Sequence, residues 1–202
     1  MASIYQLKPA FQNMLRPLSD ALARVGVTAN QVTVLAVALS CLVGFFLWRY
    51  PSARWPLLLV PGFLFLRMAL NAIDGMLARD HRQKSALGAM LNELGDVVSD
   101  AALYLPFALL PGILPEWVVL IVFAAVVSEM AGVVAIQIGA SRRYDGPMGK
   151  SDRALVFGAL ALALGLGVPV GAWVNWLLAG LLALLMLTTL NRARQALQEV
   201  SA

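Results

Sequence analysis

Two apolar stretches of the sequence carry charged and amide side chains between residues 67 and 100. The set consists of Arg67, Asn71, Asp74, Arg79, Asn92, Glu93, Asp96 and Asp100. An ionised side chain near the centre of a membrane-spanning helix costs on the order of 2.5–3.5 kcal/mol, so several in one region indicate ion pairs, a bound metal or a water-filled cavity. This region is therefore the first candidate for a functional site.

Helical spacing collects these side chains on two faces. One face holds Asn71, Asp74, Gly75, Ala78 and Arg79, and the other holds Gly88, Asn92, Asp96 and Asp100, four residues apart. The polar break at residues 80–87 has room only for a chain reversal, so the two helices are expected to be antiparallel neighbours. That register predicts three pairs at equal depth: Asn71 with Asp96, Asp74 with Asn92, and Arg67 with Asp100 as an ion pair.

The chemistry that suits such a cluster is the binding of a hard divalent cation. Carboxylate and amide oxygens, here from Asp74, Asp96, Asn71 and Asn92, are the ligands that magnesium and manganese prefer, whereas softer metals favour His or Cys. His81, the only histidine, falls in the break between the two helices and is interpreted as a solvated surface residue.

The motif formed by these residues resembles the signature of the CDP-alcohol phosphotransferase family. That signature reads Asp-x-x-Asp-Gly-x-x-Ala-Arg, eight further residues, and Gly-x-x-x-Asp-x-x-x-Asp. The chain has Asp74, Gly75, Ala78, Arg79, Gly88 and Asp96 at the matching spacing. It departs from the signature at Asn71 and Asn92, where the family has Asp. The stretch VTANQVT at residues 27–33 is also similar, so the resemblance covers most of the chain.

The resemblance implies a site built from these same residues. It places a divalent metal, Mg²⁺ or Mn²⁺, on Asn71, Asp74, Asn92 and Asp96, and it makes Asp96 also the base for an acceptor hydroxyl. It lets Gly75, Ala78, Arg79 and Gly88 contact the CDP group. The two Asn residues halve the formal charge of the four motif positions from minus four to minus two, so weaker binding of at least one metal ion is expected.

The reaction that the resemblance implies is transfer of a phosphatidyl group from CDP-diacylglycerol to a small alcohol, with release of CMP. Transfer of a CDP-linked head group to a lipid alcohol is the alternative within the family. Two alternatives involve no such reaction. The Asn residues at positions 71 and 92 leave open a catalytically inactive protein. The buried charges leave open a transporter, although a transporter would not explain the motif. The family also implies a homodimer.

Lys150 and Arg153 are further candidates for holding a phosphate group of a substrate. Ser151 or Asp152 is typical of a helix cap, which would place both cations where a helix begins at the membrane surface. Glu129 lies inside an apolar stretch, where it either selects a cationic alcohol or hydrogen-bonds another helix.

The elements that must position these residues are membrane-spanning helices. Hydrophobic residues make up 60% of the 202-residue chain and charged residues only 13%, so lipid is expected to be its main solvent. Six apolar stretches are predicted to span the membrane, at 32–48, 56–77, 87–110, 117–140, 155–170 and 174–190. Residues 1–29 are predicted to form an amphipathic helix at the interface, and residues 30–194 a six-helix bundle. The predicted fold class is an all-α integral membrane protein with one domain over residues 1–202.

The positions of lysine and arginine predict the orientation. Basic residues precede the first span, occupy the breaks after the second and fourth spans and follow the sixth, whereas the other side has only Arg49 and Arg54. The positive-inside rule therefore places both termini in the cytoplasm, and the resemblance implies a bacterial inner membrane. Because this bias explains the net charge of +4, no nucleic-acid partner is expected. Arg142 and Arg143 have two possible explanations: they bind a phosphate group of a substrate, or they only reflect this bias of basic residues toward the cytoplasmic side.

Overall fold

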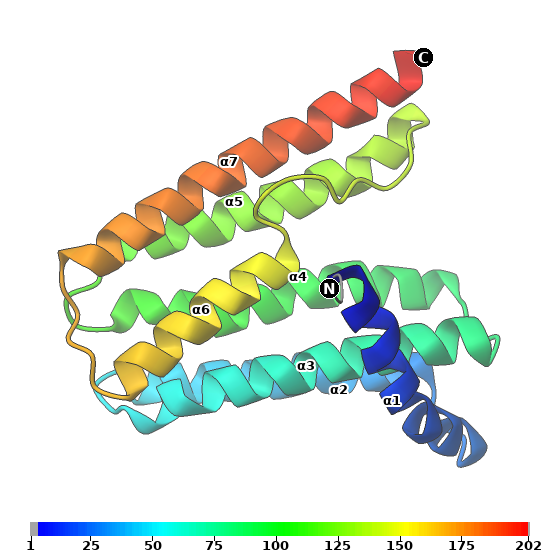
Figure 1. The fold of residues 1–202 in the computed structure, drawn as a ribbon, viewed down its shortest axis with the longest axis horizontal. Coiled ribbons are helices and arrows are strands. Elements are labelled where there is room, and N and C mark those ends of the chain that lie inside the picture. Colours follow the sequence, from blue (N-terminus) through cyan, green and yellow to red (C-terminus); the bar gives the residue numbers. More distant parts are fainter. Residues whose placement is uncertain (1–3, 202) are drawn as a thin grey trace. The chain divides into compact units, whose positions relative to one another are not determined.

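The computed structural model describes residues 4–201 as helices joined by short connections, with no strand in that range (Figure 1). The α-helices are α1 (Ile4–Arg24), α2 (Ala29–Arg49), α3 (Trp55–Asp80), α4 (Ala86–Tyr104), α5 (Pro115–Val134), α6 (Lys150–Gly165) and α7 (Ala172–Ser201). Two 3-10 helices, η1 (Leu105–Leu109) and η2 (Ala135–Ile138), follow α4 and α5. The predicted all-helical fold class is confirmed.

Four helical segments are long and apolar enough to cross a membrane: α2, α3, α5 together with η2, and α7. They contain 21, 26, 24 and 30 residues, and a hydrocarbon core of about 30 Å requires roughly 20 residues. The other two predicted spans correspond to helices of a different character. α4 has 19 residues and carries Glu93, Asp96 and Asp100, whereas α6 has only 16 residues.

Two predicted spans are divided in the structure. The span predicted at 87–110 is interrupted because α4 ends at Tyr104 and η1 continues the chain. Pro106 lacks the N–H that an α-helix needs and disfavours helical geometry at the residue before it. The span predicted at 117–140 likewise consists of α5 followed by η2, which ends at Ile138 before Gly139 in the left-handed conformation (φ 89°).

The chain forms two compact units. The first consists of Met1–Leu42 and Gly62–Ser99, and the second of Val43–Pro61 and Asp100–Ala202. The division therefore falls within the lengths of α2, α3 and α4, so that each of these helices contributes one part to each unit. The polar motif at residues 71–96 belongs to the first unit, and α5, α6 and α7 belong to the second.

The first unit has an apolar core between α2 and α3. Its buried residues are Ala29, Val32, Ile73, Met76 and Leu77, and Leu15 and Leu22 of α1 pack against them. The N-terminus of α2 is capped reciprocally, because Gln31 N–H donates to Thr28 Oγ1 (3.3 Å) and Thr28 N–H donates to Gln31 Oε1 (2.9 Å). These contacts hold α2 beside the motif-bearing end of α3.

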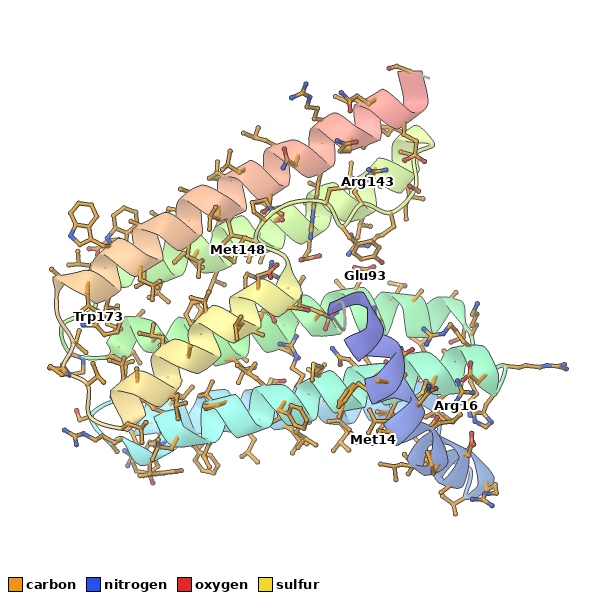
Figure 2. The ribbon with its side chains drawn as sticks, viewed as in Figure 1. Met14, Arg16, Glu93, Arg143, Met148 and Trp173 are labelled. Carbon is orange, nitrogen blue, oxygen red and sulfur yellow. The ribbon has the colours of Figure 1, made fainter. Side chains whose placement is uncertain are left out.

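Polar contacts join α1 to the C-terminal end of α3. Arg16 Nη1 lies 3.5 Å from Asp80 Oδ2, and His81 Nε2 lies 2.9 Å from Asp20 Oδ1. His81 is therefore a half-buried partner of α1 rather than the solvated residue that the sequence predicted. The exposed Met14 extends from the same helix, and Figure 2 labels Met14 and Arg16 on it.

The second unit is built around the pair α5 and α7, which run side by side (Figure 1). Aromatic packing joins α6 to the end of α4, where the rings of Tyr104 and Phe157 stack with centroids 4.1 Å apart. The start of the unit is tightly packed as well. Gly44 of α2 is buried so closely against the backbone carbonyl of Ala102 in α4 that no side-chain carbon fits between them.

Adding one methyl group at this contact is expected to destabilise the protein. Because the obstructing atom in Gly44→Ala is a backbone carbonyl oxygen, the helices must separate, and overpacking of this kind costs typically 1–3 kcal/mol. We expect a lower midpoint of thermal unfolding in detergent than for wild type. Gly180→Ala in α7 is the matched control, since a methyl group there meets nothing within 4 Å. Equal midpoints for the two variants would contradict the packing seen at Gly44.

Candidate functional site

The antiparallel pair α3 and α4 brings Asn71 and Asp96 together, as the predicted register requires. Asn71 Nδ2 donates to Asp96 Oδ1 over 3.3 Å. Arg67 Nη2 approaches the same residue, donating to Asp96 Oδ1 at 3.3 Å and to its backbone carbonyl at 3.2 Å. The carboxylate of Asp96 is therefore held in place by two side chains of α3.

Asp74 lies on the other flank of the motif and is buried, with 6% of its surface exposed. Thr33 of α2 donates from Oγ1 to Asp74 Oδ2 over 2.8 Å. The sequence reasoning missed Thr33 as a site residue, although Thr33 belongs to the stretch 27–33 that carried part of the family resemblance. The Thr33 hydroxyl thus fixes the position of one carboxylate oxygen of Asp74.

Two glycines allow close approaches near the cytoplasmic ends predicted for α3 and α4. The guanidinium of Arg79 folds back over Gly75, so that a Cβ at Gly75 would lie 3.2 Å from Arg79 Nη1. Gly88 donates its N–H to Ser85 Oγ over 3.0 Å, and a Cβ there would lie 2.8 Å from Asn30 Oδ1. Asn30 is a second polar residue of α2 that the sequence reasoning did not assign to the site.

The remaining motif residues are more open. Asn92 of α4 is exposed and Ala78 of α3 is half-buried. Of the predicted pairs, the structure brings Asn71 to Asp96 by a hydrogen bond, and it brings Arg67 to Asp96 as well. Asp100 forms an ion pair with Arg153 of α6.

The chemistry of these donors fits a hard divalent cation. Over the described residues, no three His, Cys, Asp or Glu side chains gather closely enough to hold a metal ion by themselves, so a cation here would also need amide oxygens. The motif itself contains only two carboxylates, because Asn replaces Asp at positions 71 and 92. The hydrogen bonds described above end on Oδ2 of Asp74 and on Oδ1 of Asp96. Asn71 uses its amide nitrogen toward Asp96, and its carbonyl oxygen is the atom suited to a cation.

A second polar cluster lies in the second unit around Glu129 of α5. Glu129 binds Arg142 (3.2 Å), Arg153 (3.1 Å) and Arg192 (3.1 Å), and Arg153 also binds Asp100 (2.8 Å). Of the two alternatives for Glu129, the structure shows the contacts to other helices. In these contacts three guanidinium groups share two carboxylates.

Arg153 is buried in this cluster, with only 1% of its side chain exposed. Its Nη1 atom has no hydrogen-bond partner among the described residues, and the same holds for Nε of the buried Arg192. Lys150, the first residue of α6, is half-buried. The helix begins there because Gly149 N–H donates to Asp152 Oδ2 over 2.9 Å, so Asp152 caps the first turn.

The loop between η2 and α6 is attached to the end of α7. Arg143 Nη1 donates to Glu199 Oε2 over 2.6 Å, and Ser141 donates to the same carboxylate from its N–H and its hydroxyl. A hydrogen bond to Asp145 raises the pKa of Arg143 above its usual value, so the residue stays charged. Figure 2 labels Arg143 and Met148 along this loop. Arg142 and Arg143 are therefore engaged with acidic side chains of the second unit.

The family follows from the sequence profile that matches this motif and its surroundings. The family model described as CDP-alcohol phosphatidyltransferase matches residues 26–190, which is most of the chain. The chain belongs to the CDP-alcohol phosphatidyltransferase family. It is a membrane protein and a transferase of the CDP-alcohol phosphatidyltransferase type. The family acts in phospholipid synthesis.

The relatives of this CDP-alcohol phosphatidyltransferase differ in their sequence identity to it. The inner membrane protein YnbA of Escherichia coli is 47% identical over 197 residues, which cover 96% of each chain. The archaetidylinositol phosphate synthase of Pyrococcus horikoshii is 25% identical over 181 residues, covering 85% of this chain and 90% of the other.

Solved structures share its fold. The phosphatidylinositol phosphate synthase PgsA1 of Mycobacterium tuberculosis, crystallised with CDP-DAG bound, aligns with a TM-score of 0.70 and 20% identity, covering 91% of this chain and 92% of that one. A second crystal structure of PgsA1, in complex with manganese and citrate, aligns with the same TM-score over 92% of this chain and 88% of the other.

Proposed function

We propose that this protein transfers a phosphatidyl group from CDP-diacylglycerol to a small alcohol and releases CMP. The observation that carries the proposal is the position of Asp96, which Arg67 and Asn71 hold on the α3–α4 pair that also bears Asp74. Support comes from the family and from the neighbouring structure of PgsA1, which was solved with CDP-DAG.

Different residues of the chain have different roles in this reaction. Asn71, Asp74, Asn92 and Asp96 would hold Mg²⁺ or Mn²⁺, which when bound neutralises charge on the substrate pyrophosphate. Asp96 takes the proton of the acceptor hydroxyl as its oxygen forms a bond to the phosphorus that carries diacylglycerol. The bond from that phosphorus to the bridging oxygen breaks, and CMP leaves with the electron pair. Gly75, Ala78, Arg79 and Gly88 contact the CDP group, and the Arg79 guanidinium stabilises charge on the departing CMP.

Lys150 and Arg153 hold an anionic group of a substrate in this proposal. The support is the buried Arg153 Nη1, which has no hydrogen-bond partner among the described residues. A buried guanidinium N–H without a partner is costly, and an anionic oxygen would satisfy it. The first turn of α6, which begins at Lys150, adds the favourable field of a helix N-terminus.

The proposal includes the placement of the chain in its membrane. We propose one domain over residues 1–202, with six spans and both termini in the cytoplasm of a bacterial inner membrane. The family and the inner-membrane relative support this placement, and α4 and α6 would be the two additional spans. In this arrangement α1 lies at the interface, where the exposed Met14 and Leu18 meet lipid. A homodimer is proposed from the family alone.

A donor and acceptor panel tests the proposed reaction. Protein purified in detergent is incubated with CDP-diacylglycerol, Mg²⁺ or Mn²⁺, and each of glycerol 3-phosphate, serine, inositol phosphate, glycerol and choline. We expect CMP release with one acceptor, loss of that release in EDTA and its recovery on adding the metal. If CMP were released only from a CDP-linked head group with diacylglycerol as acceptor, the reaction would instead be transfer of a head group to a lipid alcohol. No CMP from any combination would favour an inactive protein.

A further inference from the structure

We propose that Thr33 of α2 is a positioning residue of the site: its side chain orients the Asp74 carboxylate for metal binding and attaches α2 to both motif helices. This inference rests on the proposed function, in which Asp74 is a ligand of Mg²⁺ or Mn²⁺. It adds α2 as a third element to a site whose sequence motif lies on α3 and α4 alone.

The first observation is the contact between Thr33 and Asp74, which are both buried. Thr33 Oγ1 donates to Asp74 Oδ2 over 2.8 Å. The same hydroxyl lies 3.1 Å from the backbone carbonyl oxygen of Ala29, one turn earlier in α2. A hydroxyl has a single proton to donate, and the shorter distance identifies the carboxylate as its main acceptor. The hydrogen bond thus joins two helices and fixes Asp74 Oδ2 relative to α2.

The second observation is the position of the Thr33 methyl group, which lies beside α4. A Cβ at the buried Gly95 would lie 2.9 Å from Val37 Cγ2 and 3.7 Å from Thr33 Cγ2. Gly95 directly precedes Asp96, and its missing side chain lets α2 approach α4 there. Because a β-branched side chain has few χ1 rotamers, the packing of the methyl group against α4 keeps the hydroxyl directed at Asp74. One side chain therefore contacts both motif helices.

The third observation is that the start of α2 is anchored to the break between α3 and α4. Gln83 Oε1 accepts a hydrogen bond from the Ala29 N–H over 2.7 Å, and Gln83 Nε2 donates to the Val27 carbonyl over 3.4 Å. Ala29 is the first residue of α2, and N–H groups of a first turn lack acceptors within their own helix. Gln83 therefore caps α2 one turn before Thr33 and holds that part of α2 near Asp74.

These contacts make Thr33 an outer partner of a proposed metal ligand. Asp74 and Asp96 come from different helices, so a cation that binds both requires a fixed helix spacing and fixed directions of the carboxylates. The Thr33 hydroxyl serves the direction of Asp74, and its methyl group serves the spacing to α4. Loss of such an outer partner typically lowers metal affinity by about ten- to a hundredfold.

Binding of Mn²⁺ to the purified protein tests this role. Free Mn²⁺ is measured by electron paramagnetic resonance during a titration of each variant. Thr33→Val keeps the shape of the side chain but lacks the hydroxyl, so we expect its Mn²⁺ affinity to fall by about ten- to a hundredfold. Thr33→Ser restores the hydroxyl and should recover most of this loss. Thr189→Val is the matched control, because Thr189 Oγ1 donates to the Leu185 carbonyl within α7, and its affinity should equal that of wild type.

Thermal unfolding in EDTA separates positioning from folding. The rise in the unfolding midpoint on adding Mn²⁺ should be smaller for Thr33→Val than for wild type. A lower midpoint in EDTA together with wild-type Mn²⁺ affinity would make Thr33 a purely structural residue and overturn the inference. If Thr33→Val does not fold, Gln83→Met decides the question. It removes the cap of α2 and should weaken Mn²⁺ binding, whereas wild-type affinity would overturn the inference.

These readouts keep the inference distinct from the proposed function. A protein whose Mn²⁺ affinity depends on the Thr33 hydroxyl but which releases no CMP would defeat the proposed function alone. Metal-dependent CMP release combined with unchanged Mn²⁺ affinity in Thr33→Val would defeat the role of Thr33 alone.

Discussion

Asp96→Asn is expected to lower CMP release from CDP-diacylglycerol by at least about a thousandfold. Loss of a general base alone typically costs 10²–10⁴ in rate, and this substitution also removes one of the two carboxylates of the proposed metal site. The amide would retain the size of the side chain, so the α3–α4 pair should stay intact. The measurement is the initial rate of CMP release at saturating donor, together with the affinity for Mn²⁺, which should weaken in parallel.

Glu116→Gln is the matched control for this experiment. It also replaces a carboxylate by an amide, but Glu116 lies exposed in the first turn of α5, away from the motif helices in the sequence. We expect its rate to remain within about twofold of wild type, since exposed substitutions of this kind usually have little effect. If Asp96→Asn retained a rate close to that of the control, Asp96 would be neither the base nor a necessary metal ligand.

Arg153→Met is expected to be the most destabilising single substitution in the second unit. Arg153 pairs with the carboxylates of Asp100, near the end of α4, and Glu129, within α5. The substitution removes both of these ion pairs. Removing one partner of a buried ion pair typically costs about 3–5 kcal/mol, because the remaining charge stays buried. At 2–4 °C per kcal/mol for a chain of this length, the midpoint of thermal unfolding should fall by roughly 6–20 °C.

Arg194→Met serves as the control for Arg153→Met, because Arg194 lies exposed on α7, close in sequence to the buried Arg192. Its midpoint should stay within about 2 °C of wild type. The double variant Arg153→Met with Asp100→Asn should recover part of the loss, since it removes the charge of one carboxylate that has lost Arg153 as a partner. Equal midpoints for Arg153→Met and Arg194→Met would show that the ion pairs of Arg153 contribute nothing to stability.

Several features of the candidate site follow from the sequence alone. The helical period places Asn71 and Asp74 on one face, and the short break before α4 makes the two helices antiparallel neighbours. Those two constraints leave little freedom in the register, which is why the predicted contact of Asn71 with Asp96 occurs in the structure. The all-helical class follows from the recurring apolar stretches, since a stretch of roughly 20 apolar residues has the length of a membrane-spanning helix, which satisfies its own backbone hydrogen bonds.

The contacts that cross between other helices were decided only by the tertiary structure. Thr33 binds Asp74 although 41 residues separate them, and no period within one helix predicts which neighbour that helix meets. The end of α4 was also predicted imprecisely, because Pro106 acts locally within an apolar sequence.

Arg153 shows most clearly the difference between what the sequence predicts and what the tertiary structure decides. The sequence placed it correctly near the start of a helix, where a basic residue is typical of an exposed membrane surface. In the structure it is buried, because Asp100 and Glu129 come from two other helices and compensate its charge. The sequence by itself thus determined the type and spacing of the site residues and the pairing of α3 with α4, since these depend on contacts close along the chain. The partners of each buried charge depend on how distant helices pack, and only the folded chain decided them.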